Sequence, residues 1–281
     1  MNEKVLTQEM IGGFRDNLVL EERSAATIEK YTRDAKRFCD YAGGKCITKE
    51  LVIAYKEDLR LLGYAVRSIN SMLASINSLF RYLDWNDIHV KSIKIQQQIF
   101  CSEEKELSKS EYFSLVKAAY NRKDETMCLI LQTICSTGIR VSELEFVTVE
   151  AVINGEAVVS CKGKTRTIFI VSELQKKLVD YCKKRGIKEG PVFLTKVGNP
   201  VNRSLIWHRM KGLCKVAKVN PSKVFPHNLR HLFARSFYNL DNDIAKLADV
   251  LGHSNINTTR IYIVSTGSEH RKKLEKMHLT L

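Results

Sequence analysis

The spacing of the apolar residues constrains the fold of this chain more than any other feature, because it repeats at helical intervals over most of the sequence. The segment "VRSINSMLASINSLFRYLDW" places its apolar residues on one helical face: Ile69, Met72, Leu73, Ile76, Leu79, Phe80 and Leu83. Two earlier segments combine this pattern with helix start and stop signals, one between Ser24 and Gly43 and one between Thr48 and Gly63. From Thr7 to about Trp85 the sequence therefore predicts a compact bundle of about four helices.

A stretch without helical periodicity, residues 89–106, follows this bundle. It is polar, lacks glycine and proline, and is charged at its end. We interpret it as a linker between an N-terminal helical domain of residues 1–88 and a second domain of residues 107–281. The second domain opens with Ser108 and Glu111, which have the spacing of a capping box.

The second domain is predicted to be helical with one β-rich interruption. The runs "GEAVVSC" and "TRTIFIV" flank "KGK" and are typical of a hairpin in which Gly163 supplies a positive φ. A further helix is expected from about Arg140. The expected fold class is thus mainly α with a small β-sheet or hairpin, an α+β domain behind an N-terminal helical bundle.

The charge of the chain indicates a polyanionic partner. Its 281 residues carry 45 Lys and Arg against 31 Asp and Glu, a net charge of +14, and nucleic acid is the commonest partner of such an excess. A membrane surface is the competing interpretation. However, no apolar run approaches the roughly 18 residues of a membrane span, and the N-terminus has no signal-peptide core. We expect a cytoplasmic protein.

The eight cysteines are scattered, form no C-x-x-C pair and have mostly apolar neighbours. This pattern is typical of reduced thiols in a hydrophobic core and does not suggest zinc.

Four short motifs contain the polar residues that carry chemistry. They are "TGIRVSEL", "SCKGKTR", "PHNLRH" and "LGHSNINTTRIY", and their residues of interest are Arg140, Glu143, Lys162, His227, Arg230, His253 and Tyr262. Each residue alone has an ordinary structural explanation. Arg140 and Glu143 have the spacing of a surface ion pair. A tyrosine such as Tyr262 is most often an aromatic residue of a core or an interface. His227 and His231 are four apart like a helical metal pair, but the surrounding zinc-protease pattern is missing.

In this order and spacing the four motifs resemble the tyrosine recombinase family of the phage-integrase type. The resemblance covers about residues 107–262, and the N-terminal segment is similar to the family's core-binding domain in helical character only. It implies a site-specific recombinase, an integrase or a Xer-like resolvase, that cuts and rejoins duplex DNA through a 3′-phosphotyrosyl bond. Neither ATP, a metal nor another cofactor is expected. Residues 1–6 are too few for the arm-site-binding domain that some integrases carry.

The resemblance makes Tyr262 the nucleophile, and the chemistry of the neighbouring motifs fits this role. A phenol has a pKa near 10, so forming a phenolate at neutral pH requires roughly 4 kcal/mol of local stabilisation. Arg140 and Arg230 would grip a phosphodiester and stabilise its transition state, because the guanidinium matches phosphate geometry. The remaining roles fall to four other side chains: Lys162 as general acid, His227 and His253 as base or hydrogen-bond donors, and Glu143 to orient the cations.

The hairpin sequence allows two lysines as the general acid. "CKGKTR" is one residue shorter than the family's frequent G-K-G-x-K-x-R form, so Lys164 is an alternative to Lys162. We favour Lys162 because the K-G step then aligns and Arg166 keeps its place.

The expected partners are double-stranded DNA with recombination half-sites and further copies of the chain, in a tetramer on paired sites. A second recombinase or an accessory factor is an alternative further partner. The tail at residues 268–281 is expected to act on a neighbouring protomer. Basic residues proposed to contact DNA are Arg67, Lys91, Arg166, Arg203, Arg209, Lys211 and Arg260. Two other functions stay open, a non-catalytic DNA-binding regulator of the same fold and a type IB topoisomerase-like enzyme.

Overall fold

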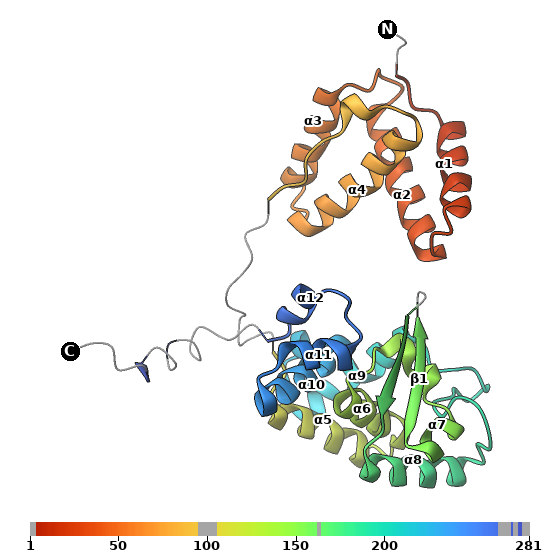
Figure 1. Ribbon diagram of the computed structural model, residues 1–281, viewed down its shortest axis with the longest axis vertical. Helices are drawn as coiled ribbons and strands as arrows, with labels where there is room; N and C mark the ends of the chain where they lie inside the picture. Colours follow the sequence, from red (N-terminus) through yellow and green to blue (C-terminus); the bar gives the residue numbers. More distant parts are fainter. Residues whose placement is uncertain (1–3, 95–105, 162–163, 264–270, 272–274, 277–281) are drawn as a thin grey trace. The chain divides into compact units, whose positions relative to one another are not determined.

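The computed structural model describes residues 4–94, 106–161, 164–263, 271 and 275–276 (Figure 1). The chain forms two compact units, residues 1–97 and residues 98–281. The predicted turn at Gly163 lies outside the described residues, as does the tail apart from Arg271, Glu275 and Lys276.

The N-terminal unit is the predicted bundle of four helices. These are α1 (Gln8–Leu20), α2 (Ala25–Ala42), α3 (Lys49–Leu61) and α4 (Val66–Tyr82), followed by the 3₁₀ helix η1 (Asn86–Ile88). Local signals set the helix ends, since Gly43 ends α2 in the left-handed region and the Thr48 hydroxyl accepts the Leu51 amide at the start of α3. The core holds aromatic side chains from three helices, Phe14, Phe38 and Phe80.

Residues 89–94 belong to this packed unit, although the sequence suggested that the linker begins at residue 89. The Asn77 side chain bonds both the amide and the carbonyl of Val90, and Asn70 does the same with Ile93. Val90 is buried. Two asparagines on one face of α4 thus satisfy the backbone of an extended segment, a pairing that helical periodicity does not reveal.

The second unit is mainly helical and contains the predicted hairpin (Figure 1). Its elements are α5 (Lys109–Asn121), α6 (Glu125–Thr137), η3 (Val141–Phe146), α7 (Val149–Asn154), β1 (Glu156–Cys161), β2 (Lys164–Phe169), α8 (Ser172–Arg185), α9 (Arg203–Ala217), η4 (Pro221–Lys223), α10 (Pro226–Asp241), α11 (Ile244–Leu251) and α12 (Ile256–Arg260). The capping box of Ser108 and Glu111 opens α5 as expected. This architecture confirms the predicted fold class.

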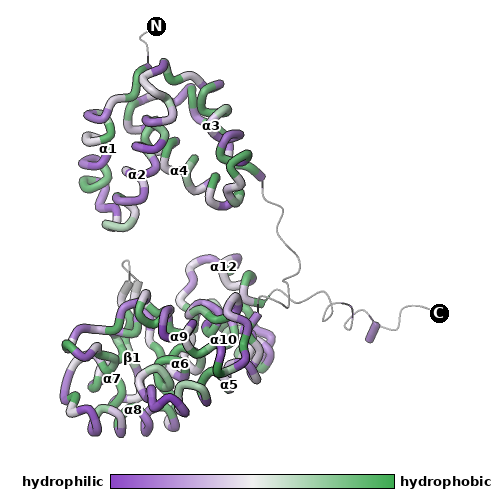
Figure 2. The backbone as a smooth tube through the Cα atoms, turned by 180° about the vertical axis from the view of Figure 1, so that it is seen from behind, coloured by the Kyte–Doolittle hydropathy of each residue, from purple (hydrophilic) through white to green (hydrophobic). Residues whose placement is uncertain are grey.

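Helix α6 lies at the centre of the second unit. Most of its residues are buried, whereas α8 turns a hydrophilic side outward (Figure 2). Because α6 is fixed on several sides, its C-terminal end is a rigid support for the residues that follow it.

The hairpin pairs β1 with β2 in antiparallel register, and one of its faces is buried. Ala157, Val159 and Ile168 lie on this face, and Arg166 stands opposite Val159 in the same row. Side chains alternate between the two faces of a strand, so Arg166 shares the inner face with Ile168. A charged side chain on a buried face needs a partner of opposite charge, and Glu143 is that partner for Arg166.

No helix within the described residues is long and apolar enough to cross a membrane. The six cysteines whose side chains are described are all free thiols, and Cys128, Cys182 and Cys214 are buried.

Candidate active site

The site begins where α6 ends. Gly138 has φ 66°, in the left-handed region, and a Cβ there would lie 2.4 Å from the Phe233 ring, so only glycine fits without rearrangement. The chain then turns through Arg140 into η3. The helix expected from Arg140 is therefore a 3₁₀ helix, in which side chains three apart are stacked directly above one another.

Glu143 joins two arginines. Its carboxylate accepts Arg140 Nη1 at 2.8 Å and the Arg140 amide at 2.9 Å, and it accepts Arg166 Nη2 at 2.7 Å and Nη1 at 3.2 Å. Glu143 is only 1% exposed. Burial alone would raise the pKa of Glu143, but the hydrogen bonds from Arg140 and the charges of Arg166 and Arg140 outweigh it and lower that pKa. The carboxylate is therefore an ionised support for both cations.

Arg230 is held at the centre of the site by backbone carbonyls. Pro226 starts α10 and places Arg230 on its inner face, where the residue is 1% exposed. Its guanidinium donates to the carbonyls of Gly138 and Leu251, the latter at 2.7 Å. Burial and the nearby Arg140 charge lower the pKa of Arg230 to about 10, so the group stays cationic at neutral pH.

His253 bridges Arg230 and α12. Its Nε2 lies 3.0 Å from Arg230 Nη2, and its Nδ1 lies 2.9 Å from the Thr259 hydroxyl. Burial, followed by the charges of Arg230, Arg140 and Arg166, lowers the pKa of His253 to about 4. The imidazole is neutral at physiological pH.

Tyr262 follows α12 directly and is buried, with 5% of its surface exposed. It packs against Ala234, Leu247 and Leu251 in a small apolar cluster. The His253 ring stacks on the Tyr262 ring with centroids 5.5 Å apart, and the His227 ring is tilted to it with centroids 5.4 Å apart. The Arg230 guanidinium carbon lies 5.9 Å from the ring centroid. Residues from α10, from α11 and from the loop after α11 thus surround the phenol.

His231 is a site residue that sequence reasoning considered only as a metal ligand. Its ring centroid lies 4.3 Å from that of Tyr262, closer than either predicted histidine, and burial lowers its pKa to about 4. The signal was its position one helical turn after His227. Among the described residues, no group of three His, Cys, Asp or Glu side chains is arranged to hold a metal ion.

His227 occupies the more open side of the site. Desolvation lowers its pKa, and the charges of Arg230, Arg203 and Arg140 lower it further. These effects place Arg203, at the start of α9, within electrostatic reach of the site.

The predicted DNA-contact residues have different environments. Arg67, Lys91, Arg203 and Arg260 are exposed. The other three have partners within the chain: Arg166 pairs with Glu143, Arg209 pairs with Asp124, and Lys211 donates to the Pro221 carbonyl. The side chains of Lys162 and Lys164 lie outside the described part of the structure.

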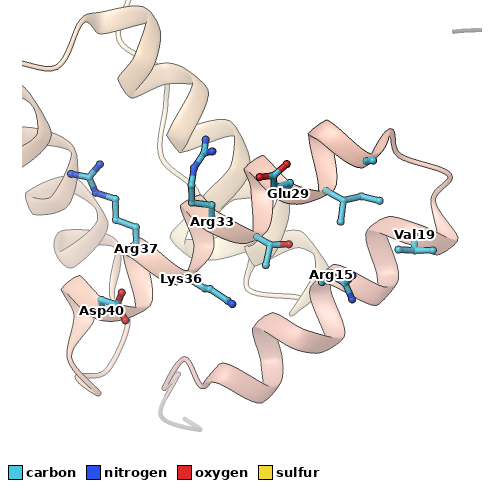
Figure 3. Close-up of a pocket in the computed structure, with 10 residues that line it drawn as sticks. Arg15, Val19, Glu29, Arg33, Lys36, Arg37 and Asp40 are labelled. Atoms are coloured by element: carbon cyan, nitrogen blue, oxygen red, sulfur yellow. The ribbon is translucent and has the colours of Figure 1, made fainter. Parts of the chain in front are cut away.

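The N-terminal unit has a basic groove that sequence reasoning did not identify. Figure 3 shows Arg33, Lys36 and Arg37 along α2 and Arg15 with Val19 on α1. Two carboxylates, Glu29 and Asp40, also line it. The cations come from two helices, so no single stretch of sequence displays them together.

The site in the second unit thus combines three arginines, one buried carboxylate, three histidines and a buried phenol. Its excess of fixed positive charge suits a phosphate group, and the phenol lies beside that charge. Such an arrangement can bind a phosphodiester and bring a nucleophile to it.

The chain belongs to the phage integrase family. Residues 105–269 match this family, and residues 11–87 match the phage integrase N-terminal SAM-like domain. The first match covers the whole site.

Relatives over nearly the whole chain are tyrosine recombinases. The chain is 29% identical to the tyrosine recombinase XerA of Pyrococcus horikoshii, across 99% of this chain and 96% of the relative. It is 27% identical to XerD of Halalkalibacterium halodurans, across 90% and 91%. A lambda integrase dimer bound to a core site shares the fold, with a TM-score of 0.75 at 16% identity over 92% of this chain and 95% of that one.

Proposed function

We propose that this chain is a site-specific DNA recombinase that cuts and rejoins duplex DNA with Tyr262 as nucleophile. The observation that carries the proposal is the burial of the Tyr262 ring beside the Arg230 guanidinium and the rings of His227, His231 and His253. In the reaction the phenol oxygen bonds to phosphorus, the bond from phosphorus to the 5′ oxygen breaks, and a 3′-phosphotyrosine forms. Attack by another strand's 5′ hydroxyl reverses these changes without an external energy source.

Arg140 and Arg230 would hold the phosphate and stabilise the charge of the transition state. Arg140 has a partly open side chain, with 37% of its surface exposed while Glu143 orients it. Arg230 Nε is a buried donor with no hydrogen-bond partner among the described residues. A phosphate oxygen would satisfy such a donor.

Proton transfers would involve the histidines and the hairpin lysine. Neutral His227, which is exposed and has a lowered pKa, would accept the phenol proton. His253 would stay neutral, because its Nε2 already accepts from Arg230 and its pKa is lowered to about 4. Lys162, or Lys164 as the alternative, would protonate the departing 5′ oxygen.

The proposed assembly is a tetramer on paired half-sites, with the helical domain, 1–88 together with the packed segment 89–94, and the catalytic domain, 107–281, both binding DNA. A solved relative, a lambda integrase tetramer, is bound to a Holliday junction. The basic groove and the exposed residues Arg67, Lys91, Arg203 and Arg260 would supply phosphate contacts. The role is either integration of a mobile element or Xer-like dimer resolution, in the cytoplasm at the nucleoid.

A nicked suicide substrate tests the proposal, because loss of the cut fragment traps the covalent intermediate. The unaltered chain should form an adduct, and Tyr262→Phe should bind the same DNA without forming one. Tyr238→Phe is the matched control, since Tyr238 packs against the same apolar cluster. An adduct that persists in Tyr262→Phe, or that maps to Tyr238, would overturn the assignment.

The same assay addresses the two other functions. A non-catalytic regulator would give no adduct, and this function is disfavoured because His227, Arg230 and His253 are in place around Tyr262. A topoisomerase-like enzyme would give the adduct but relax single duplexes without pairing two sites. Recombination between two sites on one plasmid separates it from a recombinase.

A further inference from the structure

We propose that Arg166 is a positioning residue for catalysis and not a DNA contact. It would fix Glu143 and couple the lysine-bearing hairpin to the segment that contains His253. The inference rests on the proposed function for its catalytic consequence, while its structural part can be tested separately.

The first observation is the direction of the Arg166 side chain. Arg166 lies on the inner face of the hairpin, in line with buried Ile168, and 12% of its side chain is exposed. A residue that binds phosphates along a duplex normally presents its charged end to solvent. Here the charged end points into the site.

The second observation is the geometry with Glu143. Arg166 donates to both carboxylate oxygens, at 2.7 and 3.2 Å, while Arg140 and its amide approach the same two oxygens. This pairing uses both terminal nitrogens of the Arg166 guanidinium, which a lysine ammonium cannot reproduce. The contact fixes the carboxylate plane, and the carboxylate in turn fixes Arg140.

The third observation explains the glycine of the "LGH" motif. Gly252 ends α11 with φ 66°, and a Cβ there would lie 2.6 Å from Arg166 Cδ and 2.9 Å from Nη1. Arg166 therefore lies across the backbone immediately before His253. One side chain contacts η3 through Glu143 and the end of α11 through Gly252.

These contacts make Arg166 a junction between three parts of the site. Its loss would leave buried Glu143 with one cationic partner and remove the support between β2 and the His253 segment. Displacements of about 1 Å can cost about 100-fold in rate. The chemical step should suffer, while contacts to the DNA backbone stay the same.

Single-turnover cleavage of the suicide substrate at saturating DNA separates the two roles. Arg166→Ala should slow cleavage by about 100-fold, the cost of misplacement, with the Kd for site DNA and its salt dependence nearly unchanged. Arg166→Lys should restore little of the rate. A weaker Kd with a shallower salt slope, and a normal rate at saturation, would make Arg166 a phosphate contact and overturn the proposal.

Gly252→Ala tests the contact with the end of α11. In the unaltered chain the added Cβ displaces Arg166, so cleavage should slow. In Arg166→Ala that collision is absent and only the strain of a positive φ is left, so Gly252→Ala should slow Arg166→Ala by a much smaller factor than it slows the unaltered chain. Gly186→Ala is the matched control, because Gly186 ends α8 at φ 67° with open space around it. Multiplicative rate losses in the double variant would contradict the proposed junction.

A stability measurement keeps the structural part independent of activity. Arg166→Ala should lower the urea midpoint of the full chain, and this shift should shrink when Glu143 is already Gln. Equal shifts in both backgrounds would show that Arg166 does not support Glu143. If the unaltered chain forms no adduct but this coupling is present, the proposed function fails while the structural link stands.

Discussion

His253 Nε2 lies 3.0 Å from Arg230 Nη2, and this contact fixes the protonation state of the imidazole. Arginine can only donate, so Nε2 must accept. The proton is then on Nδ1, which lies 2.9 Å from the Thr259 hydroxyl and donates to it. Burial, followed by the Arg230 charge, disfavours a second proton on Nε2, which agrees with a pKa of about 4 for His253. The active-site loop thus depends on a neutral histidine.

The first prediction concerns stability at acid pH. The pKa values of His253 and His231 are lowered to about 4 in the folded chain, below the ordinary value of 6.5. As the pH falls from about 6.5 towards 4, these histidines become protonated in the unfolded chain but stay neutral in the folded chain. The free energy of unfolding therefore decreases. The expected loss is roughly 2 kcal/mol per histidine at pH 5. Urea unfolding between pH 5 and 8 measures it. In His253→Gln the decrease should be smaller, and an unchanged pH dependence would show that His253 is not held neutral.

The second prediction concerns the general acid. Lys162→Ala should reduce cleavage by up to about 10⁴-fold, the contribution of one acid. A substrate with a 5′-thiolate leaving group should restore the rate, because a thiolate departs without a proton. Lys164→Ala should respond little to that substrate. Rescue of Lys164→Ala in place of Lys162→Ala would exchange the two roles.

The third prediction concerns the basic groove of the N-terminal unit. The double variant Arg33→Ala, Lys36→Ala should weaken binding of all duplexes, and the slope of log affinity against log salt should become shallower by about 0.9 for each phosphate that the groove no longer neutralises. Cleavage at saturating DNA should stay near normal. The control is Lys176→Ala, which changes an exposed lysine of α8; this helix lies on the side of the second unit opposite α12 (Figure 1). An unchanged salt slope in the double variant would exclude the groove from DNA binding.

The fourth prediction concerns the requirements of the reaction. Transfer of a phosphodiester to Tyr262 conserves bond energy, and the proposed charge stabilisation comes from Arg140 and Arg230. Strand cleavage should therefore continue in EDTA and without nucleoside triphosphates. Loss of cleavage in EDTA, restored by one particular divalent ion, would indicate a different reaction.

The helices of the N-terminal unit and several helix ends could be predicted from residues that lie close together in the sequence. Helical periodicity indicated a bundle of about four helices, and local signals at Gly43, Thr48 and Ser108 set helix ends where the structure has them. These features depend on residues a few positions apart, so the sequence contains nearly all of the physics that decides them. The motif spacing likewise indicated a tyrosine recombinase before any fold was known.

Residues distant in the sequence met only through tertiary packing. Arg166 was expected on DNA, yet it bonds Glu143, which lies 23 positions earlier, because β2 packs its inner face towards η3. The strand register places Arg166 on the inner face with Ile168, and tertiary packing decided what this face contacts. His231 reaches Tyr262 for the same reason, since α10 and the chain after α12 are brought together by the shared apolar cluster. Spacing along the chain identified the chemistry, and burial of apolar surface decided which side chains surround it, because such burial is non-directional and joins segments regardless of their separation.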